Sequence, residues 1–148
     1  MDPIDDHTVV QLDKSLYVFG GFAGGSRVNS VRAATFTAPS SLALSTTRGN
    51  ERPSKVMPIP RNAHSAVAYG NSLFIFGGQD EDNNKLSDLW EFNVTTKQWA
   101  QIAYSSSLQE VGRSGHAAVG FGSKMYVFGG ILEVTKELND LLVYDFKT

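Results

Sequence analysis

A pattern of histidine, hairpin and glycine pair, repeated three times, is the feature that most limits how this chain can fold. In each copy a histidine stands 13 residues before the first glycine of a Gly-Gly pair, and the three copies align without a gap. They run from His7 to Gly21, from His64 to Gly78 and from His116 to Gly130. The histidines are 57 and 52 residues apart. A period near 50 residues is typical of propellers and solenoids, so the chain is expected to repeat one structural unit.

The local pattern inside each unit predicts strands. Gly70-Asn71 and Gly122-Ser123 separate two apolar stretches, and such pairs favour hairpins because a tight turn needs positive φ angles. The arm after the turn is continuously apolar, as in Leu73–Phe76, which indicates a strand buried on both faces. Further strands are predicted over residues 88–93 and 97–102. Four antiparallel strands per unit make a propeller blade.

Composition excludes several classes of protein. The 148 residues carry a formal charge of -2, so the chain lacks the basic surface that a nucleic-acid binder needs. The absence of cysteine rules out a disulfide scaffold, a thiolate metal site and cysteine catalysis. No apolar run reaches the length of a membrane span, and the N-terminal residues lack the pattern of a signal peptide. We therefore expect a cytoplasmic protein with no membrane or nucleic-acid partner, and a nuclear location stays open.

Further motifs join the last two units. An arginine stands three residues before the histidine (Arg61 and Arg113), an Asp-Leu pair follows (Asp88 and Asp140 with the next leucine), and a late tryptophan, Trp99, marks the second unit. Together with the Gly-Gly pairs, these residues resemble the kelch repeat over about residues 6–147. The first unit departs from the pattern, because Ile4 stands where arginine is expected.

The resemblance implies an all-β fold of kelch-type β-propeller blades, each a four-stranded antiparallel sheet. Blade 1 is expected over about 6–60 with a long solvated loop at 37–60, blade 2 over 61–112, and blade 3 over 113–148 without its outer strand. Two complete blades and one incomplete blade form an open set, whereas propellers close with four to eight. We therefore expect either a fragment of a longer kelch protein or a ring that another copy of the chain completes.

The repeated residues are interpreted as structural. A position repeated in every blade implies a repeated contact, so each histidine is expected to bond the backbone of its own or the adjacent blade, and the arginines to pair with carboxylates. The arrangement around the channel leaves open a bound ion, although no metal or cofactor is predicted. This structural set comprises His7, His64, His116, Gly20, Gly21, Gly77, Gly78, Gly129, Gly130, Arg61, Arg113, Asp88, Asp140 and Trp99.

Catalytic residue sets known from kelch-like propellers are missing. Copper enzymes that resemble galactose oxidase need a cysteine, and the iron-binding Glu-x3-Asp-x3-His stretch of plant specifier proteins does not occur here. The sequence therefore predicts that the chain is not an enzyme. A carbohydrate-active or metal-dependent propeller is the first alternative, because sugar mutarotase-like sites are scattered over several blades. A structural or assembly subunit is the second.

The resemblance implies instead an interaction module, a scaffold or adaptor that binds a protein through the loops at one end of the channel. In related adaptors the contacting residues lie just before the histidine and just after the Gly-Gly pair. The rim that they form here is weakly acidic, which favours a basic or polar partner. The residues expected on this face are Asp5, Asp6, Asn62, Ala63, Gln79, Asp80, Glu81, Ser114, Ile131 and Glu133.

Overall fold

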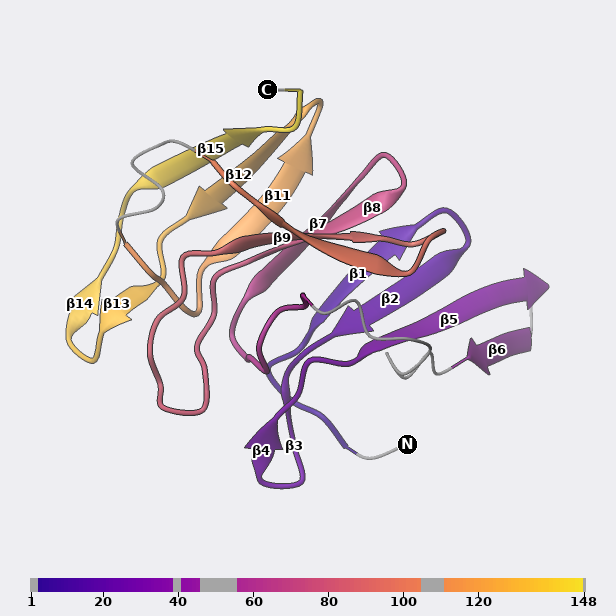
Figure 1. Ribbon diagram of the computed structural model, residues 1–148, viewed down its shortest axis with the longest axis horizontal. Helices are drawn as coiled ribbons and strands as arrows, with labels where there is room; N and C mark the ends of the chain where they lie inside the picture. Colours follow the sequence, from indigo (N-terminus) through magenta and orange to yellow (C-terminus); the bar gives the residue numbers. More distant parts are fainter. Residues whose placement is uncertain (1–2, 39–40, 46–55, 105–110, 148) are drawn as a thin grey trace.

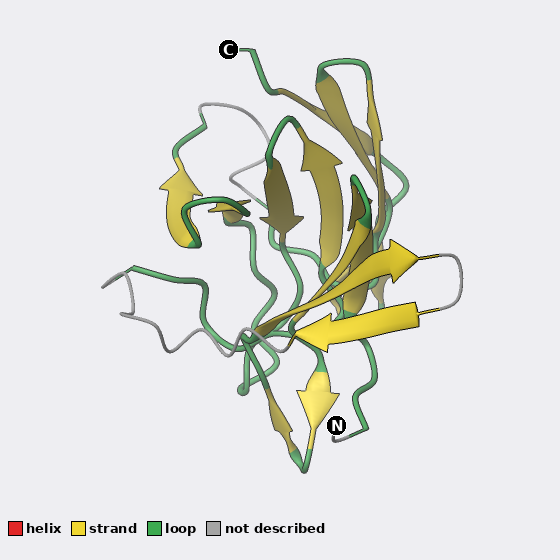
Figure 2. Cartoon of the chain, turned by 90° about the vertical axis from the view of Figure 1, so that its right-hand side faces the viewer, coloured by secondary structure: helices red, strands yellow, loops and turns green. Residues whose placement is uncertain are grey.

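The computed structural model describes residues 3–38, 41–45, 56–104 and 111–147 of the chain. These residues form strands, turns and loops, with no helix among them (Figure 2). The all-β prediction is confirmed. Within the described ranges, accordingly, no helix is long and apolar enough to cross a membrane.

Three antiparallel sheets contain most of the strands, and we call them blades 1, 2 and 3 in chain order. Blade 1 has the order β1-β2-β5-β6, with β1 at Thr8–Leu12, β2 at Ser15–Phe19, β5 at Val31–Ala38 and β6 at Ser41–Ser45. Blade 2 has the order β7-β8-β9-β10, with β7 at Ser65–Tyr69, β8 at Ser72–Phe76, β9 at Leu89–Asn93 and β10 at Gln98–Ile102. Blade 3 has the order β11-β12-β15, with β11 at Ala117–Phe121, β12 at Lys124–Phe128 and β15 at Leu141–Asp145. Two four-stranded blades and one three-stranded blade match the predicted architecture.

The expectation of a loop over residues 37–60 is wrong in its first part. Strand β5 continues to Ala38, and β6 pairs with it from Ser41 to Ser45, so blade 1 has an outer strand. The sequence Ser-Leu-Ala-Leu-Ser alternates as a strand does, and the free edge of β5 offers it backbone partners. The low apolar content of this stretch hid that short pattern. Residues 39–40 and 46–55 of the expected loop lie outside the described ranges.

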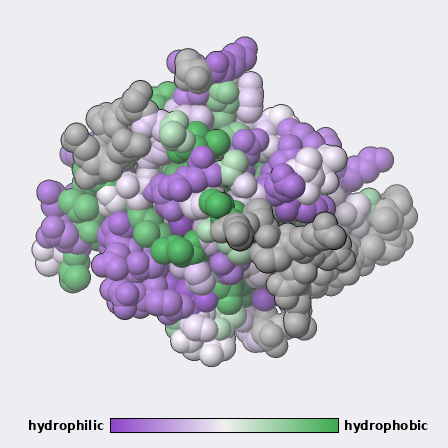
Figure 3. Space-filling view, viewed as in Figure 1, coloured by the Kyte–Doolittle hydropathy of each residue, from purple (hydrophilic) through white to green (hydrophobic). Residues whose placement is uncertain are grey.

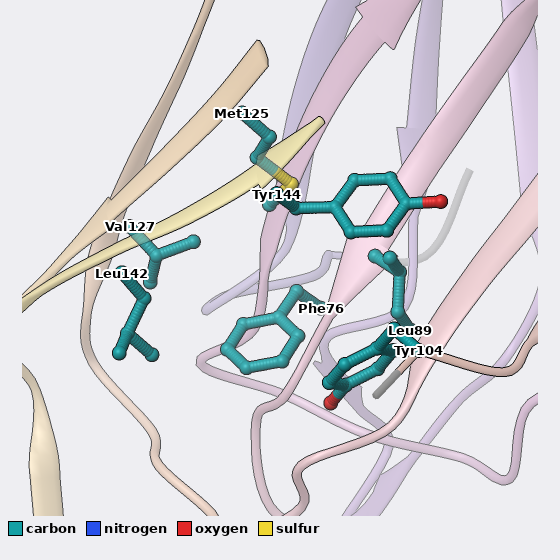
Figure 4. Close-up of a pocket in the computed structure, with 7 residues that line it drawn as sticks. All are labelled: Phe76, Leu89, Tyr104, Met125, Val127, Leu142 and Tyr144. Atoms are coloured by element: carbon teal, nitrogen blue, oxygen red, sulfur yellow. The ribbon is translucent and has the colours of Figure 1, made fainter. Parts of the chain in front are cut away.

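The blades stack face to face, and the cores lie between them. Val10, Phe19 and Val31 of blade 1 pack on Leu73, Ile75, Trp90 and Phe92 of blade 2. The opposite face of blade 2 packs on blade 3. Side chains from the two sheets, together with Tyr104 just after β10, point toward one another there: Phe76, Leu89, Tyr104, Met125, Val127, Leu142 and Tyr144 (Figure 4). Every residue of β8 is buried. A strand covered on both faces can be apolar throughout, which explains the unbroken run in the sequence.

The blades are arranged as a fan, with β1, β7 and β11 as the neighbouring inner strands (Figure 1). The connections that follow the Gly-Gly pairs all leave the same end of the fan. In blade 1 this connection is a hairpin of β3 (Phe22–Ala23) and β4 (Ser26–Arg27), and in blade 3 it is a hairpin of β13 (Ile131–Glu133) and β14 (Lys136–Glu137). In blade 2 it is the loop over residues 79–85. We call this end the loop face.

Replacing Gly77 with alanine should destabilise the protein by about 3 kcal/mol, mostly through a steric clash. At Gly77 φ is +63°, and a Cβ atom would lie 2.8 Å from the carbonyl oxygen of Arg113 and 2.9 Å from Cε1 of His116. Gly70 is the matched control, because its φ is +58° and no atom stands within 4 Å of its Cβ position. Gly70→Ala should therefore cost only the backbone strain of about 1 kcal/mol. Urea denaturation measures both losses, and equal losses would contradict the close contact between blades.

Candidate functional site

The structure brings together, in every blade, the two segments that the sequence assigned to the loop face. The residue two before each histidine forms an antiparallel bridge with the first residue after the Gly-Gly pair. Phe22 N–H donates to Asp5 O at 2.9 Å, Gln79 N–H donates to Asn62 O at 3.0 Å, and Ile131 N–H donates to Ser114 O at 2.8 Å. Each blade thus presents its leading segment and its connecting loop as one paired unit.

Neighbouring blades are linked along this face by a second set of backbone bonds. The residue before each histidine has a left-handed backbone, with φ of 49° at Asp6, 53° at Ala63 and 67° at Gly115. Ala63 N–H donates to Asp6 O at 3.1 Å, and Gly115 N–H donates to Ala63 O at 2.8 Å. The three residues therefore form a continuous rim across the blades. Around the rim, hydrophilic residues gather at the lower left of Figure 3, where Figure 1 places the loop face.

Arg27, which the sequence reasoning did not select, connects the loops of blades 1 and 2. Only 9% of its side chain is exposed. Its Nε donates to Asn62 Oδ1 at 2.6 Å, a terminal nitrogen donates to Asn83 Oδ1 at 2.7 Å, and another lies 3.7 Å from a carboxylate oxygen of Glu81. The backbone N–H of Arg27 also donates to Glu81 at 2.5 Å. A basic residue six or seven positions after the Gly-Gly pair of each unit was the available signal, since Lys85 and Lys136 stand at similar places.

These contacts engage much of the predicted acidic rim. Glu81 is paired with Arg27, and Asp6 accepts a hydrogen bond from Asn62 Nδ2 at 3.2 Å. Asp80 accepts bonds from the backbone of Asp82 and from the backbone and side chain of Asn84, which close its own loop. Desolvation works against the charge of Asp80, but the bonds from Asn84 outweigh it and hold its pKa below the ordinary value.

Asp5 and Glu133 differ from the other acids of the rim. Both are exposed, and the described part of the chain offers no hydrogen bond to either carboxylate. The hairpin of blade 3 also projects apolar side chains, with Ile131 39% and Val134 97% exposed. The loop face therefore has a braced part on blades 1 and 2 and a more open part on blade 3.

Two buried arginines stabilise the loop face from inside blades 2 and 3. Arg61 is fully buried, and its guanidinium donates to both carboxylate oxygens of Asp88 at 2.6 and 2.8 Å and to Gly77 O at 3.0 Å. Arg113 repeats this arrangement in blade 3, with Asp140 at 2.8 and 2.9 Å and Gly129 O at 2.9 Å. Bonds from the arginines lower the pKa of both aspartates, against the desolvation that opposes their charge. Because both side chains are buried and their terminal nitrogens are bonded in this way, the arginines are not presented to a ligand.

The histidines join each blade to the one before it. His64 Nε2 lies 3.1 Å from Phe19 O and 2.9 Å from Thr8 Oγ1, and His116 Nε2 lies 2.9 Å from Ser65 Oγ. Desolvation, with the charge of the nearby arginine, lowers the pKa of His64 to about 3 and that of His116 to about 4. Both rings are therefore neutral and turned into the junction between blades. His7 is exposed.

Trp99 and the remaining repeated residues lie in these junctions as well. The ring of Trp99 is 5.0 Å from Phe19 of blade 1 and 4.9 Å from Phe92 of its own blade. In blades 1 and 2 the first glycine of the pair, Gly20 or Gly77, lies against the histidine ring of the next blade. Throughout the described ranges, no three His, Asp or Glu side chains converge as metal ligands would.

Comparison with known proteins identifies the family. The model of the KLHDC2/KLHL20/DRC7 Kelch-repeats domain matches residues 6–148, and the chain belongs to this kelch-repeat family. It is 33% identical over 130 residues to tRNA wybutosine-synthesizing protein 2/3/4 of Arabidopsis thaliana, covering 84% of this chain and 12% of that protein. It is 33% identical over 141 residues to Leucine-zipper-like transcriptional regulator 1 homolog of Drosophila melanogaster, covering 91% of this chain and 14% of that protein.

Kelch domain-containing protein 3 of Bos taurus is 28% identical over 131 residues, which cover 84% of this chain and 34% of that protein. The chain thus spans about a third or less of the length of these curated relatives.

Proposed function

We propose that this chain is a protein-interaction module, a kelch scaffold or adaptor, that binds its partner on the loop face. The observation that carries the proposal is the pairing of leading segment and connecting loop in all three blades, linked by the rim of Asp6, Ala63 and Gly115. Such a surface combines a fixed backbone with exposed side chains, which suits recognition of a partner. Asp5, Asp6, Glu81 and Glu133 are exposed there, whereas Asn62 and Ser114, which the sequence also assigned to this face, are buried. The buried arginines and histidines brace the blades, and the module acts without a cofactor and without catalysis. We place it in the cytoplasm or the nucleus.

The partner that this face suits is a polar or basic protein segment with some apolar content. Asp5 and Glu133 supply free carboxylates, while Phe22, Ile131 and Val134 supply exposed apolar area at the same end. Glu81 is a weaker candidate for direct contact than the sequence indicated, because Arg27 already pairs with it. Opposite charges across such a face accelerate encounter and fix orientation more than they add affinity.

Reversing the two free carboxylates, Asp5→Lys with Glu133→Lys, should weaken partner binding at least tenfold. Asp13→Lys is a matched control, because Asp13 lies in the turn after β1, at the opposite end of the blade. The measurement starts with capture from a cell extract by the wild-type chain, the control and the double variant. Proteins that bind the first two but not the double variant are identified, and their affinities are then measured with purified components. A partner that binds the double variant as tightly as the wild type would exclude these carboxylates from the contact.

A role in assembly is the second candidate, and one observation favours it. The face of blade 3 that points away from blade 2 exposes Phe121, Phe128 and Leu141, with 77%, 56% and 59% of each residue accessible. An apolar row of this kind on a sheet face is typical of an interface. The carbohydrate-active or metal-dependent alternative has no comparable observation in its favour.

A further inference from the structure

The bridge that Arg27 makes between the loops of blades 1 and 2 is not repeated between blades 2 and 3. Lys85 is the basic residue at the similar place in blade 2, and its ammonium group donates to the side chain of Gln79 in its own loop. Ser114 stands where Asn62 offers its amide oxygen to Arg27. Among the described residues, no side-chain bond of this kind links the connecting loop of blade 2 to blade 3.

Contacts on which the packing of the blades depends recur from blade to blade. Arg61 and Arg113 each bond an aspartate and a glycine carbonyl, and His64 and His116 each bond across a junction. Blade 2 packs on blade 3 without a bridge like that of Arg27. The fold therefore does not require this bridge. Because burying a guanidinium has a desolvation cost, its presence at the loop face points to a different role.

The bridge fixes the two loops relative to each other and orients a carboxylate on the rim. Arg27 donates to Asn62 Oδ1 in the leading segment of blade 2 and to Asn83 Oδ1 in the connecting loop. Since Arg27 engages the amide oxygen of Asn62, the amide nitrogen is turned toward Asp6, which accepts its hydrogen bond at 3.2 Å. Asp6 is exposed on the rim. Arg27 thus acts, through Asn62, on a carboxylate that a partner can contact.

We propose that Arg27 is a positioning residue of the loop face, which holds the loops of blades 1 and 2 in the arrangement that a basic or polar partner segment recognises. Only 9% of its side chain is exposed, so it acts through the residues that it bonds rather than by direct contact. Loops that are already held in their bound arrangement lose less conformational entropy on binding, which raises affinity. This inference rests on the proposed function and deepens it.

A charge role and a positioning role of Arg27 predict changes of opposite sign. Arg27→Met removes a cation beside Glu81, so charge alone would make the face more acidic and strengthen the binding of a basic peptide. Loss of positioning should instead weaken that binding, because the two loops then move independently. Arg27→Lys keeps the charge but lacks the planar fork of donors. A charge role therefore predicts wild-type affinity for this variant, and a positioning role predicts a loss.

Peptides selected from a random display library on the immobilised wild-type chain serve as the probe. Those that contain lysine or arginine, and whose binding is lost with Asp5→Lys and Glu133→Lys, report on the loop face. Their affinity for Arg27→Met should fall about tenfold, and their affinity for Arg27→Lys by a smaller factor. Asn62→Ser should also weaken binding, because it cuts the link to Asp6. Its fold should persist, since Ser114 occupies the equivalent position in blade 3.

Two further measurements separate positioning from general stability. Ser72→Ala is the control, because Ser72 is buried at the opposite end of blade 2, where its hydroxyl donates to Glu91 at 2.6 Å. This change should destabilise the chain without altering the affinity for the peptides. Hydrogen exchange needs no peptide: the amides of Asn62 and Gln79, which bond each other's carbonyl groups, should exchange about tenfold faster in Arg27→Met.

The outcomes distinguish this inference from the proposed function. Unchanged exchange in Arg27→Met, or peptide affinities equal to or higher than those of the wild type, would overturn the positioning role. Equal weakening by Ser72→Ala would overturn it as well, because stability alone would then explain the effect. In these cases the loss of binding on reversal of Asp5 and Glu133 still supports the proposed function. A selection that yields no peptide dependent on those two carboxylates would overturn both.

Discussion

Replacing Arg61 with alanine should lower the free energy of unfolding by about 3 to 5 kcal/mol, the cost of removing one partner of a buried ion pair. The change deletes three bonds to Asp88 and Gly77 and leaves a carboxylate that is 22% exposed without its cation. It also empties a fully buried volume between the loops of blades 1 and 2. Chemical denaturation at neutral pH, with the slope checked against the wild type, measures the loss.

Arg113→Ala provides the internal comparison for this prediction. Its bonds repeat those of Arg61, but the side chain of Asp140 is 44% exposed, so water can replace part of the lost interaction. We expect a smaller loss than for Arg61→Ala. Arg61→Lys retains the charge but lacks the planar pair of donors, so its free energy of unfolding should lie between those of Arg61→Ala and the wild type. This variant keeps the prediction testable if Arg61→Ala does not fold. A loss below about 1 kcal/mol for Arg61→Ala would contradict the bracing role.

Lowering the pH should destabilise the protein already at pH values well above those at which carboxylates become protonated. The pKa of His64 is about 3 and that of His116 about 4 in the folded chain, whereas an unfolded histidine has a pKa near 6.5. The unfolded state therefore binds more protons below pH 6.5, and stability falls as the pH drops toward the folded pKa values. Each histidine contributes about 1.4 kcal/mol per pH unit, so the two together remove about 4 kcal/mol by pH 5.

The physical cause lies in the junctions between blades. Nε2 of each ring is bonded across the junction, while Nδ1 is buried with no partner among the described residues. A second proton would thus be an unsatisfied donor beside a buried arginine. Asp88 and Asp140, whose pKa values are lowered, add a further loss only below about pH 3.8.

Denaturation curves between pH 7 and pH 5 test this assignment. The double variant His64→Gln with His116→Gln is less stable at pH 7, but its stability should be nearly constant over this range. His7→Gln is the matched control, because His7 is exposed and its replacement should leave the pH dependence unchanged. A wild-type protein with equal stability at pH 7 and pH 5 would show that the two rings accept protons in the folded state.

The positions of strands in blades 2 and 3 could be predicted from the sequence, whereas the position of the outer strand of blade 1 could not. Strands β9 and β10 begin within one residue of their predicted starts, because apolar alternation and turn residues are local signals. Strand β6 pairs with β5 through the backbone, a contact that the sequence does not display, and the low apolar content of residues 37–60 as a whole concealed it. The network around Arg27 was also hidden, because its partners are 35 to 56 residues away in the chain.

The sequence by itself determined the repeat, the all-β class and the residues that each blade repeats. It could do so because strand periodicity, tight turns and glycine pairs are imposed by local backbone sterics. Only the tertiary structure decided what those residues touch. It turned His64 and His116 into the junctions between blades, engaged Glu81 and Asp80 inside the loop face, and left Phe128 open where Phe76 is covered. Burial and charge pairing depend on neighbours distant in the chain, so equivalent positions in a repeat acquire different environments.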